Sequence, residues 1–202
     1  MIMIKNIVFD MGNVMIEFNP IHYLSDIIED PSVVEKVYQE MFCNMEWQEL
    51  DRGAISEAEA LASISTRIPE YTGYVKQVMT TWFNKLKPIE GMYELVQDLK
   101  QRGYRIYLLS NASPRIYEYM DNIPAFQFFD GYLISCDIKV NKPDQEIYES
   151  LMRKYQLIAN ECIFIDDLPQ NIEGAKSVGW QGYVFNGAAD LKRFFKEQHI
   201  LE

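Results

Sequence analysis

The sequence is short of cationic residues and of cysteine. The 19 Lys and Arg residues are outnumbered by 30 Asp and Glu residues, which gives a formal net charge of -11. Because affinity for nucleic acid comes largely from cations that neutralise phosphates, this charge argues against a nucleic-acid partner. The three cysteines are an odd number with wide spacing, which argues against a disulfide framework or a zinc site.

The sequence also lacks a long apolar run. No stretch reaches the roughly 18 to 20 residues that a membrane span requires. The start, MIMIKNIVFDMGNVMI, is interrupted by Lys5 and Asp10 and has no small-residue cleavage site, so it does not read as a secretory signal. We therefore expect a cytoplasmic protein with no membrane partner. The 202 residues, 48% of them hydrophobic, are sufficient for a substantial core.

Short apolar runs of the kind found in buried parallel strands occur at residues 4–9, 104–110, 131–135, 162–166 and 181–185. All but the first follow a helical pattern, for example the one that ends at Gly103. This alternation predicts an α/β fold, with a doubly wound, Rossmann-like parallel sheet and helices on both of its faces.

A long interval between the first two strands contains amphipathic helical patterns and no convincing strand. The patterns cover residues 21–30, 32–53, 56–68 and 72–86. Ser56 followed by Glu59 has the spacing of a capping box. We therefore predict a four-helix cap at residues 17–87, inserted after the first strand, and an α/β catalytic core made of residues 1–16 and 88–202.

Polar side chains follow four of the predicted strands: Asp10 after the first, Ser110 and Asn111 after the second, Lys142 after the third, and Asp166 with Asp167 after the fourth. Taken singly, each has an ordinary explanation, such as a turn cap or a solvated lysine. Because ligands bind beyond the carboxyl ends of parallel strands, the set together predicts one shared site.

The chemistry of these side chains suits a magnesium and phosphate site. The three carboxylates need a hard cation such as Mg²⁺, which binds carboxylates, waters and phosphate oxygens. Ser110, Asn111 and Lys142 would bind the phosphoryl oxygens and stabilise their charge in the transition state. Asp10 would then attack phosphorus and form an aspartyl-phosphate, which water hydrolyses.

Four ordered motifs resemble those of the haloacid dehalogenase superfamily: VFDMGNV with Asp10, LLSN with Ser110, NKPD with Lys142, and FIDDLPQNIEGAKSVG with Asp166 and Asp167. The helical insertion is similar to the small cap that closes over the site in one subclass of that family. The resemblance covers nearly the whole chain, and it implies an enzyme whose partner is a small phosphorylated molecule.

The resemblance also implies a set of metal ligands. Mg²⁺ would be held by the Asp10 carboxylate, the Gly12 backbone carbonyl and Asp166, with Asp167 close by in the outer shell. Asn171 would orient Asp167 or its loop, or it is simply a residue at the beginning of a helix.

The chain departs from the family at Gly12, where its phosphatases and mutases usually carry an aspartate as general acid and base. The resulting Asp-x-Gly-Asn motif resembles a bacterial sugar-1-phosphatase branch. A missing acid lowers the rate by about 10²- to 10⁴-fold for a poor leaving group and by less for a good one. We therefore expect a bias toward anomeric 1-phosphates. Glu17 or His22 are candidates to replace the acid, although each is more often a surface residue.

The overall prediction is a Mg²⁺-dependent phosphatase of a small metabolite. A non-catalytic phosphate-binding protein is the alternative from another class. A mutase would need the acid missing at Gly12, and a haloacid dehalogenase would not need the paired acids. In the cap, Trp47 and Arg52 are candidates for substrate specificity, although Trp47 equally suits packing and Arg52 suits solvation. The sequence does not indicate an oligomeric state.

Overall fold

The computed structural model describes residues 3–202, which form one five-stranded parallel sheet and its surrounding helices. The strand order is β3-β2-β1-β4-β5. The strands are β1 (Asn6–Phe9), β2 (Arg105–Ser110), β3 (Gly131–Ile134), β4 (Cys162–Asp166) and β5 (Gln181–Val184). Each lies within the run that predicted it. Because β1 is central and pairs with β2 and β4, the residues after these three strands meet at one edge.

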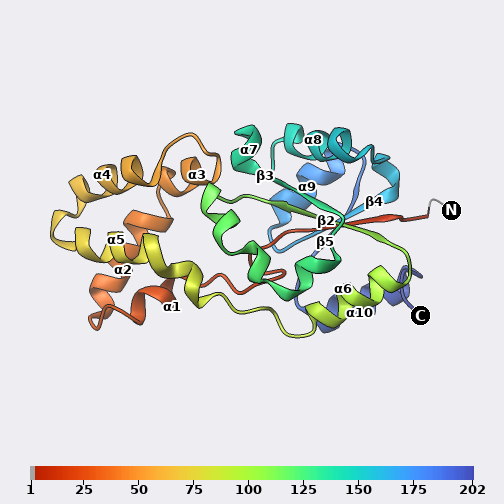
Figure 1. Ribbon diagram of the computed structural model, residues 1–202, viewed down its shortest axis with the longest axis horizontal. Coiled ribbons are helices and arrows are strands. Elements are labelled where there is room, and N and C mark those ends of the chain that lie inside the picture. The colour runs from red at the N-terminus through yellow and green to blue at the C-terminus, as the bar shows by residue number, and fades with distance from the viewer. Residues whose placement is uncertain (1–2) are drawn as a thin grey trace.

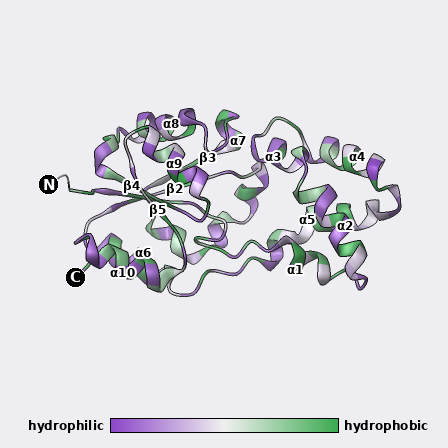
Figure 2. Ribbon diagram, turned by 180° about the vertical axis from the view of Figure 1, so that it is seen from behind, coloured by the Kyte–Doolittle hydropathy of each residue, from purple (hydrophilic) through white to green (hydrophobic). Residues whose placement is uncertain are grey.

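Helices cover both faces of the sheet, as predicted (Figure 1). One layer contains α6 (Met92–Gln101) and α10 (Ala188–Glu197), and the other contains α7 (Ser135–Ile138), α8 (Gln145–Tyr155) and α9 (Pro169–Ser177). Alternate residues of β1 pack against opposite layers: Ile7 packs with α6 and α10, whereas Val8 packs with α8 and α9. Figure 2 shows the matching alternation of hydrophobic and hydrophilic residues along these helices.

The interval after β1 is helical, but it contains more helices than predicted. Among the described residues it comprises α1 (Pro20–Ser25), α2 (Pro31–Phe42), α3 (Met45–Asp51), α4 (Glu57–Arg67) and α5 (Thr72–Thr81). The single helix predicted over residues 32–53 was wrong. Asn44 has an extended backbone, and its Nδ2 donates to the Gln39 and Glu40 carbonyls at the end of α2. This local hydrogen bonding ends one helix and starts the next.

The capping box is confirmed. The Ser56 Oγ accepts a hydrogen bond from the Glu59 N–H at 3.2 Å, and the Glu59 carboxylate accepts one from the Ser56 N–H at 2.8 Å. These two bonds satisfy backbone donors that the first turn of α4 would otherwise leave unpaired.

The segments that leave and re-enter the core lie side by side. The Glu17 N–H donates to the Lys87 carbonyl at 2.8 Å, and the Ile89 N–H donates to the Met15 carbonyl at 3.0 Å. These bonds lie close to the predicted boundaries of the cap, which remain a prediction. Short 3₁₀ helices complete the chain: η1 (Pro69–Tyr71), η2 (Trp82–Lys85), η3 (Pro114–Glu118), η4 (Met120–Asn122), η5 (Pro124–Phe128) and η6 (Ala159–Glu161).

The helices α1 to α5 pack over the carboxyl edge of the sheet (Figure 1). Their hydrophobic core is continuous with Met11, Leu108 and Ala112, which lie at that edge. Across residues 3–202, every helix is too short or too polar to span a bilayer.

Candidate active site

The loops that follow the strands surround a pocket of about 270 Å³ between the sheet and the helices α1 to α5. Seven of its lining residues are core residues singled out in the sequence: Asp10, Gly12, Ser110, Asn111, Lys142, Asp167 and Asn171. Asp166 lies beside them and is fully buried. The structure therefore brings the sequence-predicted core residues together.

Lys142 occupies the centre of this site. Its Nζ lies 2.7 Å from Asp10 Oδ1 and 2.7 Å from Asp166 Oδ2, and only 1% of its side chain is exposed. The Nζ also lies 5.1 Å from the centroid of the Phe164 ring. Because two carboxylates and an aromatic face surround it, the ammonium stays charged despite its burial.

Asn111 holds the backbone of Lys142. Its Oδ1 accepts a hydrogen bond from the Lys142 N–H at 2.8 Å, and its Nδ2 donates to the Lys142 carbonyl at 3.1 Å. Both polar ends of the amide therefore face Lys142. This geometry favours a positioning role over the direct phosphate contact expected for Asn111. Ser110, at the end of β2, is buried and lines the pocket.

Three carboxylates crowd the same edge. One oxygen from each of Asp10, Asp166 and Asp167 can be chosen so that all lie within 4.8 Å of one another. Burial raises the pKa of Asp10 to about 7, against the lowering effect of Lys142 and together with the raising effect of Asp166. Burial and Asp166 likewise raise the pKa of Asp167. A divalent cation would relieve this repulsion, so the donor set fits Mg²⁺.

Two asparagines orient the paired acids. Asn171 Nδ2 donates to both Asp166 oxygens at 3.0 Å, so it contacts Asp166 and not Asp167, for which the sequence suggested it. Asp167 instead accepts from Asn13 Nδ2 at 3.2 Å. The sequence alone did not indicate this role of Asn13. Its φ of 55° lies in the left-handed region that asparagine tolerates better than most residues.

Aromatic side chains form the opposite wall of the pocket. Phe18, Trp47 and Trp82 line it, and the ring centroids of Phe18 and Trp82 are 5.5 Å apart. Trp47 also packs against Phe42, with ring centroids 4.4 Å apart. The two readings of Trp47, pocket lining and packing, are therefore compatible.

Three charged or titratable residues considered in the sequence analysis lie outside the pocket lining. Arg52 is exposed and forms an ion pair with Glu49, so the structure gives no support to the specificity role expected for it. Glu17 and His22 are exposed, and neither lines the pocket. Their candidacy as replacement acids is therefore unsupported.

Gly12 leaves its side of the pocket without an acid. A β-carbon there would lie 3.7 Å from Phe18 Cβ, which is ordinary contact, so close packing does not force a glycine. Among residues 3–202, the helices α1 to α5 add one carboxylate to the lining, that of Asp51. Asp51 was not among the residues predicted from the sequence. Its spacing of four residues from Trp47, one turn along the same helical face, was the available signal.

Comparison with protein families matches residues 4–179 to the haloacid dehalogenase-like hydrolases. The chain belongs to this family. The resemblance drawn from the four motifs is thus confirmed, and so is the assignment as a hydrolase.

Several relatives of this hydrolase have names or structures. Sesquiterpene phosphatase astK of Aspergillus oryzae is 27% identical over 88% of this chain and 88% of its own length. D-ribitol-5-phosphate phosphatase of Bacteroides thetaiotaomicron is 26% identical over 95% of this chain and 96% of its own. The structure of a family enzyme from the same bacterium, solved with magnesium and inorganic phosphate, matches this chain with a TM-score of 0.75 and 22% identity. The match covers 95% of this chain and 99% of the other. This structural likeness shows the shared fold.

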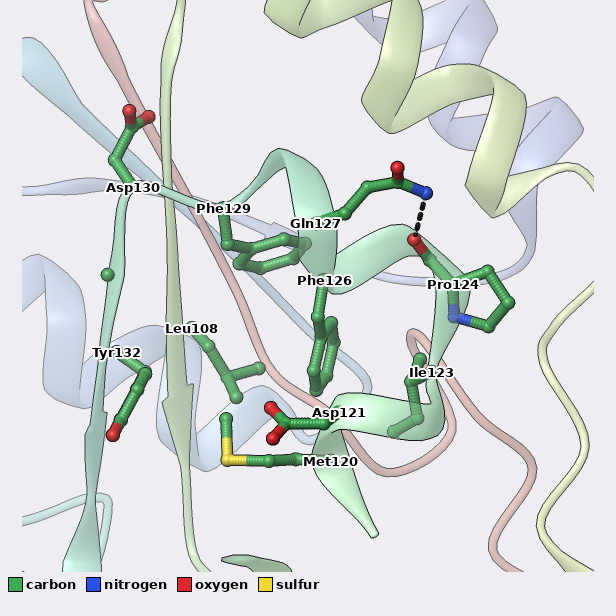
Figure 3. Close-up of a pocket in the computed structure, with 11 residues that line it drawn as sticks. Leu108, Met120, Asp121, Ile123, Pro124, Phe126, Gln127, Phe129, Asp130 and Tyr132 are labelled. Atoms are coloured by element: carbon green, nitrogen blue, oxygen red, sulfur yellow. Dashed lines mark hydrogen bonds between the residues drawn. The ribbon is translucent and has the colours of Figure 1, made fainter.

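A larger cavity of the hydrolase, of about 570 Å³, lies beside β2 and β3 under η4 and η5. Figure 3 shows Leu108, Phe126 and Phe129 among its lining residues, with Gln127 Nε2 donating to the Pro124 carbonyl at 2.8 Å. The described residues that line it include no Lys, Arg or His. A cavity without a cation does not suit an anionic phosphate, so this larger cavity is not the candidate phosphate site.

Proposed function

We propose that this hydrolase is a cytoplasmic, Mg²⁺-dependent phosphatase that acts on a small metabolite through an aspartyl-phosphate on Asp10. The observation that carries the proposal is the convergence of Asp10, Lys142 and the pair Asp166-Asp167 at one pocket. The names of the two phosphatase relatives support the same class of reaction.

The residues divide into nucleophile, phosphate-binding and metal-binding groups. Asp10 directly follows the central strand, and its N–H donates to the Ile165 carbonyl of β4 at 2.9 Å, which gives its carboxylate a rigid platform for attack on phosphorus. Lys142 and Ser110 would hold the phosphoryl oxygens as charge develops on them. Asp10, the Gly12 carbonyl and Asp166 would hold the metal, which supplies positive charge between the anionic nucleophile and the anionic substrate.

The pocket supports a small substrate. Its volume of about 270 Å³ suits a phosphate with a short organic group, and the faces of Phe18 and Trp47 suit the apolar faces of a sugar or sugar alcohol. The expected bias toward anomeric 1-phosphates holds only if no other side chain protonates the leaving oxygen. The D-ribitol 5-phosphate in one relative's name is a primary alkyl ester. A general acid accelerates its hydrolysis much more than that of an anomeric phosphate, because its leaving group is poorer.

The reaction is tested with p-nitrophenyl phosphate and three preparations: the protein with Mg²⁺, the protein with EDTA, and Asp10→Asn with Mg²⁺. We expect turnover only in the first. Absence of turnover there would favour the non-catalytic phosphate-binding alternative. Unchanged turnover by Asp10→Asn would refute the aspartyl-phosphate.

The leaving-group preference is tested separately by comparing hexose 1-phosphates with hexose 6-phosphates. Clearly faster hydrolysis of the 1-phosphates would support the anomeric bias. Equal rates would contradict it and would indicate that another group supplies the proton.

A further inference from the structure

The carboxyl group of Asp51 lies close enough to Asp10 and Lys142 for their charges to shift its pKa. Asp51 is the last residue of α3, and it lines the same 270 Å³ pocket as Asp10 and Lys142. Trp47, one helical turn earlier, lines that pocket too. The organic part of a substrate whose phosphate reaches Asp10 would therefore share this pocket with Asp51.

The end of α3 is attached to the core, so the backbone that carries the Asp51 carboxyl has a defined position. Asn141 Nδ2 donates to the Gln48 carbonyl at 2.9 Å. The Ser135 hydroxyl donates to the Asp51 carbonyl. Just beyond, Gly53 has a φ of 65°, and a β-carbon on it would lie 2.9 Å from a carbonyl oxygen of α7. Two hydrogen bonds and one close backbone contact thus hold this turn beside the pocket.

The surroundings of Asp51 favour its neutral form. Burial raises the pKa of Asp51 well above its ordinary value. The Ser113 N–H lowers this pKa by hydrogen bonding, Asp10 raises it, and Lys142 lowers it. Tyr119 and Asp167 also line the pocket. Burial and Asp51 raise the pKa of the Tyr119 phenol, and burial and Asp166 raise that of Asp167. A carboxyl group whose pKa is raised in this direction can donate a proton nearer to neutral pH.

Building on the proposed phosphatase function, we infer that Asp51 is the general acid and base of this site and replaces the side chain that Gly12 lacks. In the first step, Asp10 Oδ forms a bond to phosphorus while the bond to the leaving oxygen breaks, and Asp51 gives its proton to that oxygen. The alcohol departs, and Asp51 becomes a carboxylate.

The second step restores both carboxyl groups. Water attacks phosphorus of the aspartyl-phosphate, and its proton passes to the Asp51 carboxylate. Inorganic phosphate leaves, Asp10 is again a carboxylate, and Asp51 is again protonated. The acid therefore comes from the helices over the sheet, and not from the loop after β1.

The test compares Asp51→Asn with the wild-type protein on esters that differ in their leaving groups. One ester is p-nitrophenyl phosphate, and the other is whichever primary alkyl phosphate the wild-type protein hydrolyses best in a panel of sugar and sugar-alcohol phosphates. The first turnover is monitored after the enzyme is rapidly mixed with the ester and Mg²⁺. In Asp51→Asn, the rate of cleavage of the alkyl ester should fall by about 10²- to 10⁴-fold, and that of the aryl ester by less than about 10-fold.

A second readout follows from the base role. In Asp51→Asn, hydrolysis of the aspartyl-phosphate also slows, so p-nitrophenol should appear as a burst equal to the enzyme concentration, followed by a slow steady rate. Glu70→Gln, which neutralises an exposed carboxylate on η1, is the matched control and should leave both esters unaffected. Unfolding midpoints of both variants verify their folding.

The outcomes separate this inference from the proposed function. The role of Asp51 would be refuted, and the phosphatase function retained, if Asp51→Asn lost the same fraction of its rate on both esters or lost none on either. It would also be refuted if the wild-type protein hydrolysed the aryl ester but no primary alkyl ester. Absence of wild-type turnover on every ester would overturn the phosphatase, and the role of Asp51 with it.

Discussion

Replacing Lys142 with methionine removes the ammonium that separates two buried carboxylates. In the wild-type protein, Lys142 Nζ lies 2.7 Å from both Asp10 and Asp166. Methionine fills a similar volume but supplies no charge. Asp10 and Asp166 would then face each other without a counter-ion, in a place where water is largely excluded. We therefore expect Lys142→Met to be much less stable than the wild-type protein when no metal is present.

The magnitude follows from the burial of the three groups. Removing one partner of a buried ion pair costs about 3–5 kcal/mol, because the remaining charge is left desolvated. With a denaturant slope of about 2 kcal/mol per molar urea, the unfolding midpoint should fall by about 1.5–2.5 M. Mg²⁺ should raise the midpoint of the variant more than that of the wild-type protein, because the variant has more uncompensated negative charge.

The assay is urea unfolding in EDTA and in Mg²⁺, with Lys176→Met as the control. Lys176 pairs with Glu173 at 2.8 Å, but their side chains are 49% and 70% exposed. Such a pair contributes about 0–1 kcal/mol. If Lys142→Met were no less stable than Lys176→Met, Lys142 would not be the counter-ion of the two acids, and the electrostatic account of the site would be refuted.

Three further changes test other contacts. Gly53→Ala should lose at least about 2 kcal/mol of stability, from its positive φ and the carbonyl 2.9 Å away, whereas Gly103→Ala, with positive φ but open space, should lose only about 1–2 kcal/mol in urea unfolding. Asn171→Ala frees both Asp166 oxygens and should weaken Mg²⁺ binding by about 10–100-fold in calorimetry; unchanged affinity would argue against that orienting role. Arg52→Ala should leave kcat/KM within about two-fold, and a larger loss would restore Arg52 as a specificity residue.

The sheet could be predicted because its strands are buried on both faces. A strand buried on both faces requires apolar residues at successive positions, so it produces a continuous apolar run in the sequence. Each strand lies within its predicted run. The helices after β1 were less well predicted. The break at Asn44 depends on side-chain hydrogen bonds to the end of α2, and the apolar pattern continues through it without interruption.

The sequence predicted which residues form the site but not which hydrogen bonds join them. Asp10, Lys142 and the paired acids follow strand ends, and parallel topology brings strand ends together. Which asparagine holds which acid depends on side-chain directions. Asn171 therefore proved to contact Asp166, while Asn13 contacts Asp167.

The sequence by itself determined the parallel α/β core, the four motifs at its carboxyl edge, and the absence of an acid at Gly12. These follow from local apolar periodicity and from the fixed direction of each strand. Only the tertiary structure placed Asp51 in the same pocket as Asp10 and left Arg52 in solvent. Those positions depend on how α3 docks on the core through Ser135 and Asn141, and a long-range contact of this kind leaves no periodic pattern in the chain.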